Sequence, residues 1–96
     1  MNTALTTETI LAALPTLPGW RYQEDKLHKR FQFVNFREAI SFLVRLSFEA
    51  EALDHHPEIH NIYQTVDINL TTHDAGNRVT EKDLALAKAI ESFNWL

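Results

Sequence analysis

The segment from Phe36 to Leu53 is the feature that most constrains the fold, because it has the pattern of one long amphipathic helix. Asn35, followed by Glu38 three residues later, is typical of a helix start, and Pro57 ends the helix. The apolar positions recur at intervals of three or four residues. The expected buried face consists of Phe36, Ile40, Leu43, Ser47, Ala50 and Leu53, widened by Val44 and Phe48. A helix with one apolar side needs another layer of structure to cover that side.

Alternating apolar and polar residues on both sides of this helix predict that the other layer is a β-sheet. Before the helix, two alternating runs are separated by Glu24-Asp25, which can form a tight turn. The apolar members of these runs are Trp20, Tyr22, Leu27, Phe31 and Phe33. After the helix, residues 59–63 and 65–71 form a second pair of strands, in which Val66, Ile68 and Leu70 give the clearest alternation.

Two shorter helices complete the predicted order of elements. The first covers residues 6–14, with Thr6 or Thr7 as its N-cap and with Pro15 and Pro18 after it. The last begins after Thr80, with Asp83 in its first turn. Its expected buried stripe consists of Leu84, Ala87, Ile90 and Phe93. The order α-β-β-α-β-β-α predicts a single α+β domain over residues 1–96, with a four-stranded antiparallel sheet and three helices on one face of it.

The composition bounds the class of function. The net charge is −4 and Lys and Arg are not clustered, so we expect no direct nucleic-acid partner. No apolar run approaches the roughly 20 residues that span a bilayer, and the first residues lack a signal-peptide pattern, so we expect no membrane partner and a cytoplasmic location. The absence of cysteine excludes disulfides, thiolate nucleophiles and cysteine-based zinc sites. A chain of this length has a small core, and association into a homo-oligomer would bury further surface and add stability. We therefore expect a homo-oligomer.

Titratable side chains are concentrated in Asp54-His55-His56-Pro57, directly after the long helix. Histidine changes its charge near neutral pH, and Glu51 and Asp54 supply carboxylates close to the two imidazoles. His73 has the parity of the polar residues of the last strand, so we expect it to project from the face or rim of the sheet opposite the core. This set of residues fits either acid–base chemistry or a metal site.

The metal site is the weaker of these two interpretations. His56 and His60 are four residues apart, as zinc ligands on a helix can be, but Pro57 lies between them and excludes that helical geometry. Adjacent histidines also rarely point the same way. We therefore expect no metal, and we interpret His28 and His60 as histidines on the surface of strands.

The histidines belong to a longer pattern with fixed intervals. It runs from Glu51-x-x-x-His55-His56-Pro57 through Tyr63 and His73 to Asp83, and Thr80-Glu81-Lys82-Asp83-Leu84 opens the last helix. In this spacing the chain resembles the pterin-4a-carbinolamine dehydratases. The resemblance is densest over residues 51–91, and the length and the order of elements agree over the rest.

The resemblance implies a hydro-lyase that dehydrates 4a-hydroxytetrahydrobiopterin to the quinonoid dihydropterin and water, in tetrahydrobiopterin recycling. It also implies a homodimer or homotetramer. Dehydration needs a proton for the leaving hydroxyl and the removal of one from a ring nitrogen, so neither a metal nor a cofactor is expected. Imidazoles can be present in both protonation states at working pH and can supply both transfers.

The resemblance also implies roles for individual residues. The candidate catalytic residues are His55, His56 and His73. Acid–base roles fall to His55 and His73, without a choice between acid and base, whereas His56 positions the substrate and carries a proton. The candidate substrate-binding residues are Glu51, Asp54, Pro57 and Asp83. Asp54 and Asp83 fit equally well as residues at helix ends, since Asp83 in a first turn suits the helix dipole.

Two positions depart from the usual form of the family. Ile59 stands where the family commonly has tryptophan, which would change the packing around a pterin if that aromatic lines the site. The turn Gly76-Asn77-Arg78-Val79-Thr80 is one residue longer than the usual Gly-Gly-Leu-Thr. This insertion leaves open where Lys82 and Asp83 lie.

The alternative function is protein binding, by a non-catalytic or bifunctional chain of the same fold. Members of the family also act as dimerisation cofactors of a transcription factor, and some relatives serve as assembly factors. A chain without catalysis would be free to lose its histidines, so the three retained ones favour activity. The last helix carries more apolar residues than one stripe needs, which predicts a self-association or partner surface there. These residues are Leu84, Leu86, Ile90, Phe93, Trp95 and Leu96.

Overall fold

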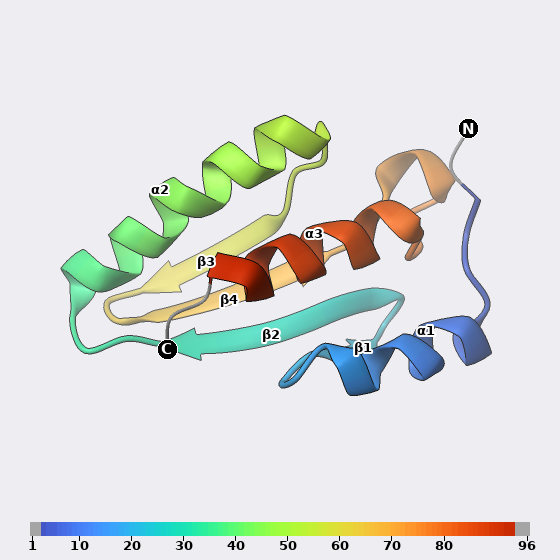
Figure 1. The fold of residues 1–96 in the computed structure, drawn as a ribbon, viewed down its shortest axis with the longest axis horizontal. Coiled ribbons are helices and arrows are strands. Elements are labelled where there is room, and N and C mark those ends of the chain that lie inside the picture. Colours follow the sequence, from blue (N-terminus) through green and yellow to red (C-terminus); the bar gives the residue numbers. More distant parts are fainter. Residues whose placement is uncertain (1–2, 94–96) are drawn as a thin grey trace.

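The computed structural model describes residues 3–93 and has the predicted order of elements (Figure 1). The helices are α1 (Thr7–Ala13), α2 (Phe36–Leu53) and α3 (Glu81–Phe93), and the strands are β1 (Arg21–Gln23), β2 (Lys26–Gln32), β3 (Glu58–Ile62) and β4 (Thr65–Leu70). Two short 3₁₀ turns are η1 (Leu14–Thr16) and η2 (His73–Ala75). The strands form one antiparallel sheet in the order β1-β2-β4-β3, which confirms the α+β architecture.

The hydrophobic core lies between one face of the sheet and the three helices (Figure 1). The central strands β2 and β4 contribute Leu27, Phe31, Val66, Ile68 and Leu70, each at most 1% exposed. The helices contribute Ile10 from α1, Phe42 and Leu46 from α2, and Leu86 and Ile90 from α3. The alternation in β2 and β4 therefore directs one set of side chains to the core, as predicted.

The opposite face of the sheet is polar and holds a charged cluster across β2 and β4. Arg30 pairs with Asp67 in the strand register, and its Nε donates to Asp67 Oδ1 over 2.9 Å. His28 Nε2 lies 3.1 Å from the same oxygen. The hydrogen bond from Arg30 holds the pKa of Asp67 below its ordinary value, and the same contact raises the pKa of Arg30. This cluster satisfies the carboxylate on the face of the sheet opposite α1, α2 and α3.

The predicted buried face of α2 is wrong except at Ala50, which is buried, and at Leu43, which is partly buried and packs against the core. Its buried residues are Ala39, Phe42, Leu46 and Ala50, of which only Ala50 belongs to the predicted set. The ring centroid of Phe42 lies 4.7 Å from that of Phe31 and 5.0 Å from that of Phe33. The helix has two apolar stripes at the same spacing, and the contacts with these strand aromatics decide which one is buried.

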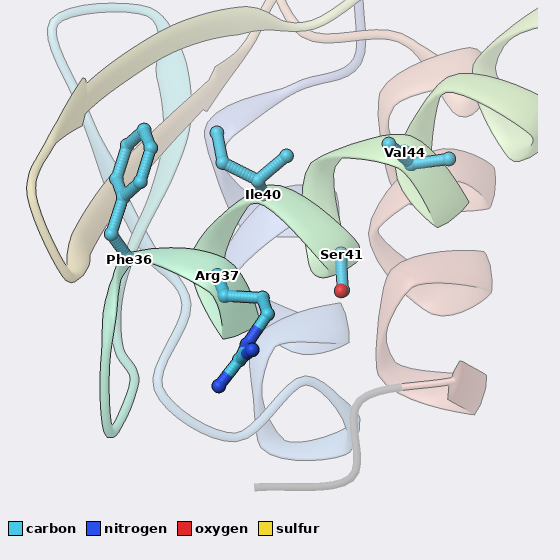
Figure 2. Close-up of a pocket in the computed structure, with 5 residues that line it drawn as sticks. All are labelled: Phe36, Arg37, Ile40, Ser41 and Val44. Atoms are coloured by element: carbon cyan, nitrogen blue, oxygen red, sulfur yellow. The ribbon is translucent and has the colours of Figure 1, made fainter.

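The second stripe faces outward and forms the α2 apolar stripe, defined here as Phe36, Ile40, Val44 and Phe48. These side chains are 49%, 37%, 53% and 69% exposed, respectively, so the helix carries a continuous apolar surface that the described residues leave uncovered. Three of the four line a shallow hollow of about 500 Å³ together with Arg37 and Ser41. Figure 2 shows Phe36, Ile40 and Val44 standing along one side of the helix.

The predicted association surface on α3 is also wrong for the described part of that helix. Leu84, Leu86, Ile90 and Phe93 are all buried within the chain. Trp95 and Leu96 lie outside the described residues. The surplus apolar surface belongs to α2 because α3 packs against α2 and the sheet, which enclose both of its apolar sides.

The local signals at the turns and helix starts are confirmed. Glu24 and Asp25 have φ of 52° and 60°, the left-handed values that a two-residue hairpin turn requires. The side chains of Thr6 and Asn35 accept hydrogen bonds from Thr9 and Glu38 backbone N–H groups, as N-caps do. Pro15 lies in η1 because a proline is tolerated in the first turn of a helix.

Candidate active site

The C-terminal end of α2 fixes the positions of the two adjacent histidines, His55 and His56. Asp54 adopts a left-handed conformation, with φ 50° and ψ 46°, and its N–H bonds to the Glu51 carbonyl. The N–H of His55 bonds to the Ala50 carbonyl over 3.0 Å. This pair of bonds is the Schellman ending of a helix, with aspartate at the position where glycine is common. The chain therefore reverses before His55, and the helix presents both histidines at its end.

His55 is buried and forms an ion-pair geometry with a buried carboxylate. Its Nε2 lies 2.6 Å from Asp83 Oδ1, and the two residues are 8% and 0% exposed. Asp83 belongs to the first turn of α3, so this contact joins the end of one helix to the start of another. A buried carboxylate needs donors for both oxygens, since an unpaired one is strongly disfavoured.

Two buried threonines supply the remaining donors to Asp83. Thr72 Oγ1 donates to Asp83 Oδ2 over 2.8 Å, and the Thr80 backbone N–H donates to the same oxygen over 2.9 Å. The hydroxyls of Thr72 and Thr80 are 2.7 Å apart. Asp83 therefore completes the predicted cap of α3 and also accepts from His55, so the expectation of a helix-end role is confirmed.

His56 and Glu51 form a second, exposed pair. His56 Nε2 lies 2.6 Å from Glu51 Oε2, and the side chains are 64% and 75% exposed. The expectation that Glu51 reaches the histidine corner is confirmed. Because the pair is open to water, its net contribution to stability is small.

His73 follows β4 and begins η2 instead of lying in the strand. It is exposed, as its parity predicts, and its Nδ1 lies 3.2 Å from Asn77 Oδ1. Thr72, the residue before it, points to the core side and is buried. The alternation of β4 therefore continues for two residues beyond the strand and places His73 on the outside.

The three histidines line one polar hollow of about 200 Å³. Its walls are Asp54, His55, His56, Thr71, Thr72, His73, Asp74 and Lys82. Asp83 lies behind His55, and neither Glu51 nor Pro57 is among the lining residues. The hollow on α2 is larger, but it contains only one titratable group, Arg37, so the polar hollow is the candidate active site.

The hydroxyls of Thr71 and Thr72 are parts of the site that no sequence pattern predicted. The signal for Thr72 was present, because it has the same parity as Leu70 and a buried hydroxyl needs a polar partner. That partner, Asp83, is eleven residues away, and no local pattern identifies it.

The two departures from the family pattern leave this arrangement intact. Ile59 pairs with Ile68 in the sheet and does not line the hollow. In the longer turn, Gly76 and Asn77 both adopt left-handed conformations, and the Asn77 N–H bonds back to the Thr72 carbonyl. The extra residue is absorbed before Thr80, so Lys82 still reaches the hollow and Asp83 still reaches His55.

Two features of residues 3–93 bear on other functions. No three His, Asp or Glu side chains come together in the way that holding a metal ion requires. None of the helices in this part of the chain is both long enough and apolar enough to cross a membrane.

The fold and the site together define a class of protein. It is a two-layer α+β domain in which histidines that follow a helix and a strand line one polar hollow, and a buried carboxylate is hydrogen-bonded to one of them. The chain belongs to the pterin 4 alpha carbinolamine dehydratase family, whose model matches residues 3–93. This confirms the resemblance found in the sequence. The family supports a dehydratase, that is, a hydro-lyase acting on a pterin.

Similar proteins agree with this assignment. A protein of Opitutus terrae that carries the name of the same dehydratase is 50% identical over 96 residues, covering 100% of this chain and 99% of its own. A protein of Christiangramia forsetii with the same name is 46% identical over 91 residues, covering 95% and 93%.

Two solved structures are similar to the chain. A transcriptional coactivator/pterin dehydratase from Brucella melitensis has a TM-score of 0.87 and 36% identity, over 93% of this chain and 96% of that one. A pterin dehydratase-like protein described as a RuBisCO assembly factor in the alpha-carboxysome has a TM-score of 0.64 and 28% identity, over 77% and 87%.

Proposed function

We propose that this chain dehydrates 4a-hydroxytetrahydrobiopterin to the quinonoid dihydropterin and water. The observation that carries the proposal is the convergence of His55, His56 and His73 on one polar hollow, with Asp83 hydrogen-bonded to His55. Membership of the dehydratase family supports the same reaction. In this role the enzyme acts in tetrahydrobiopterin recycling.

The reaction consists of two proton transfers. The hydroxyl on C4a gains a proton and leaves as water, while a ring nitrogen loses a proton and its electron pair forms the new double bond. His55 and His73 are the proposed acid–base pair, and each well-placed group of this kind contributes about 10²–10⁴-fold to the rate. His56, which is exposed and paired with Glu51, positions the pterin and exchanges protons with solvent. The carboxylate of Asp54, which lines the hollow, can accept hydrogen bonds from the guanidine-like edge of the pterin.

The direct test is a spectroscopic time course of 4a-hydroxypterin breakdown with and without the protein. We expect the protein to accelerate the breakdown, because the uncatalysed reaction lacks the positioned acid and base. Heat-denatured protein at the same concentration is the control. Equal rates with native and denatured protein would contradict the dehydratase proposal and favour the protein-binding alternative.

A second proposal concerns association, since the family resemblance implies a homodimer or homotetramer. We propose that a second copy of this chain covers the α2 apolar stripe. In an antiparallel pair of α2 helices centred on Val44, residues equally far from the centre meet, so Ile40 faces Phe48 and Arg37 faces the partner's Glu51. Arg37 takes part in none of the ion pairs among residues 3–93, so its charge is available for that contact. A two-fold axis of this kind makes both hydrophobic and charged contacts self-complementary.

Val44→Glu is expected to shift the chain from oligomer toward monomer, because it buries a charge without a partner at the centre of the proposed interface. Light scattering coupled to size-exclusion chromatography measures the mass in solution. Leu11→Glu is the matched control, because Leu11 is 51% exposed and lies on α1, away from the stripe. A wild-type protein that is monomeric, or a Val44→Glu variant with unchanged mass, would contradict association through α2.

A further inference from the structure

We infer that Nδ1 of His55 is the ring atom that exchanges a proton with the substrate. Thr72 and Thr80 are positioning residues, because they orient Asp83 so that it holds the other ring proton on Nε2. This inference rests on the proposed function, because it assigns an atom within the proposed acid–base pair. It follows from counting the protons that the buried groups around Asp83 can donate.

Each of the two threonine hydroxyls has one proton to donate. Thr72 uses its proton on Asp83 Oδ2, over 2.8 Å. Thr72 therefore accepts in its other bond, and the Thr80 hydroxyl is the donor across the 2.7 Å between them. Thr80 Oγ1 in turn accepts from the Lys82 backbone N–H, over 3.2 Å. The donors form one chain that runs from Lys82 through Thr80 and Thr72 and ends on the carboxylate.

Asp83 therefore receives two donors on Oδ2, from the Thr72 hydroxyl and from the Thr80 backbone N–H. This saturation leaves Oδ1 as the oxygen that faces His55, at 2.6 Å. A carboxylate can only accept, so Nε2 of His55 must carry a proton and donate it. Because Asp83 is 0% exposed, no water competes for this arrangement.

The other ring nitrogen is then the one that changes its protonation. Nδ1 of His55 makes no hydrogen bond to the described residues, and it is not among their buried polar atoms without a partner. It therefore keeps solvent access through the hollow that His55 lines. During turnover Nδ1 gains or loses one proton, while the other proton stays on Nε2, hydrogen-bonded to Asp83, and the carboxylate stabilises the imidazolium form, as in a catalytic triad.

The tautomer can be measured without substrate. In protein labelled with ¹⁵N-histidine, two-bond ¹⁵N–¹H correlations identify which nitrogen of each neutral imidazole carries the proton. We expect the neutral form of His55 to carry it on Nε2. A neutral His55 with its proton on Nδ1 would overturn the inference, even if the chain proves to be an active dehydratase. Conversely, an inactive chain with the expected tautomer would contradict the proposed function and leave this assignment standing.

The positioning role of the threonines is tested by Thr72→Val, which keeps the shape of the side chain and removes the donor to Asp83. We expect kcat to fall about 10-fold with KM nearly unchanged, as is typical for residues that orient a catalytic group. We also expect the spectrum of His55 to show a mixture of tautomers. Thr72→Ser keeps the hydroxyl and should restore both values.

Thr16→Val is the matched control. Thr16 lies in η1 and does not line the hollow, and its hydroxyl donates to the Ala13 carbonyl. Equal kcat and equal His55 spectra for Thr72→Val and Thr16→Val would overturn the positioning role. If Thr72→Val does not fold, failure of Thr72→Ser to match the wild-type His55 spectrum would overturn it instead.

Discussion

His55→Ala is expected to lower kcat for pterin dehydration by about 10²–10⁴-fold, the usual contribution of a positioned acid or base. The variant removes the imidazole that lies between the hollow and Asp83. The proton transfer assigned to His55 can then no longer occur. His73→Ala is expected to have a loss in the same range, because His73 faces the same hollow from η2. The measurement is the initial rate of 4a-hydroxypterin breakdown at saturating substrate.

His60→Ala is the matched control for these variants. His60 is an exposed histidine of β3 and does not line the hollow, so its replacement should leave the rate within about 2-fold of wild type. Thermal unfolding of each variant separates loss of chemistry from loss of fold, since His55→Ala also leaves the buried Asp83 without one donor. Unchanged rates in both His55→Ala and His73→Ala would contradict the acid–base assignment.

Phe42→Ala is expected to have the largest effect on stability, about 3–5 kcal/mol in the free energy of unfolding. Phe42 is 1% exposed and contacts three other aromatic rings, and the nearest centroid, that of Phe31, is 4.7 Å away. Removing the ring leaves a cavity between α2 and the sheet that the neighbouring rings cannot fill completely. Chemical denaturation followed by tryptophan fluorescence measures the change.

Phe48→Ala gives the same chemical change on the opposite side of α2. Phe48 is 69% exposed, so its replacement should change the free energy of unfolding by about 0.5 kcal/mol or less. Both variants are compared at one low protein concentration, because self-association through α2 would add to the apparent stability. Equal losses in the two variants would mean that the orientation of α2 described above is wrong.

The structure confirms those parts of the site that depend on short distances along the chain. Glu51 lies in the last turn of α2, so its approach to the histidine corner was predictable from the sequence, and the structure pairs it with His56. The cap formed by Thr80 and Asp83 is similarly local. The bond between Asp83 and His55 spans 28 residues, and only the packing of α3 against the end of α2 brings the two together.

The face of α2 shows why sequence patterning has a limit. Phe36, Ile40, Val44 and Phe48 have the same four-residue spacing as Phe42, Leu46 and Ala50, so periodicity cannot distinguish the two stripes. The stripe beside the strand aromatics is buried, and the other is exposed.

The sequence alone determined the order of the elements, their caps and turns, and the family, because each depends on residue spacing or on the conformational preference of single residues. The tertiary structure alone decided the buried side of α2 and the pairing of His55 with Asp83. It also decided the chain of donors through Thr80 and Thr72. These features depend on which segments meet in space, and that is set by the packing of the whole core and not by any local pattern.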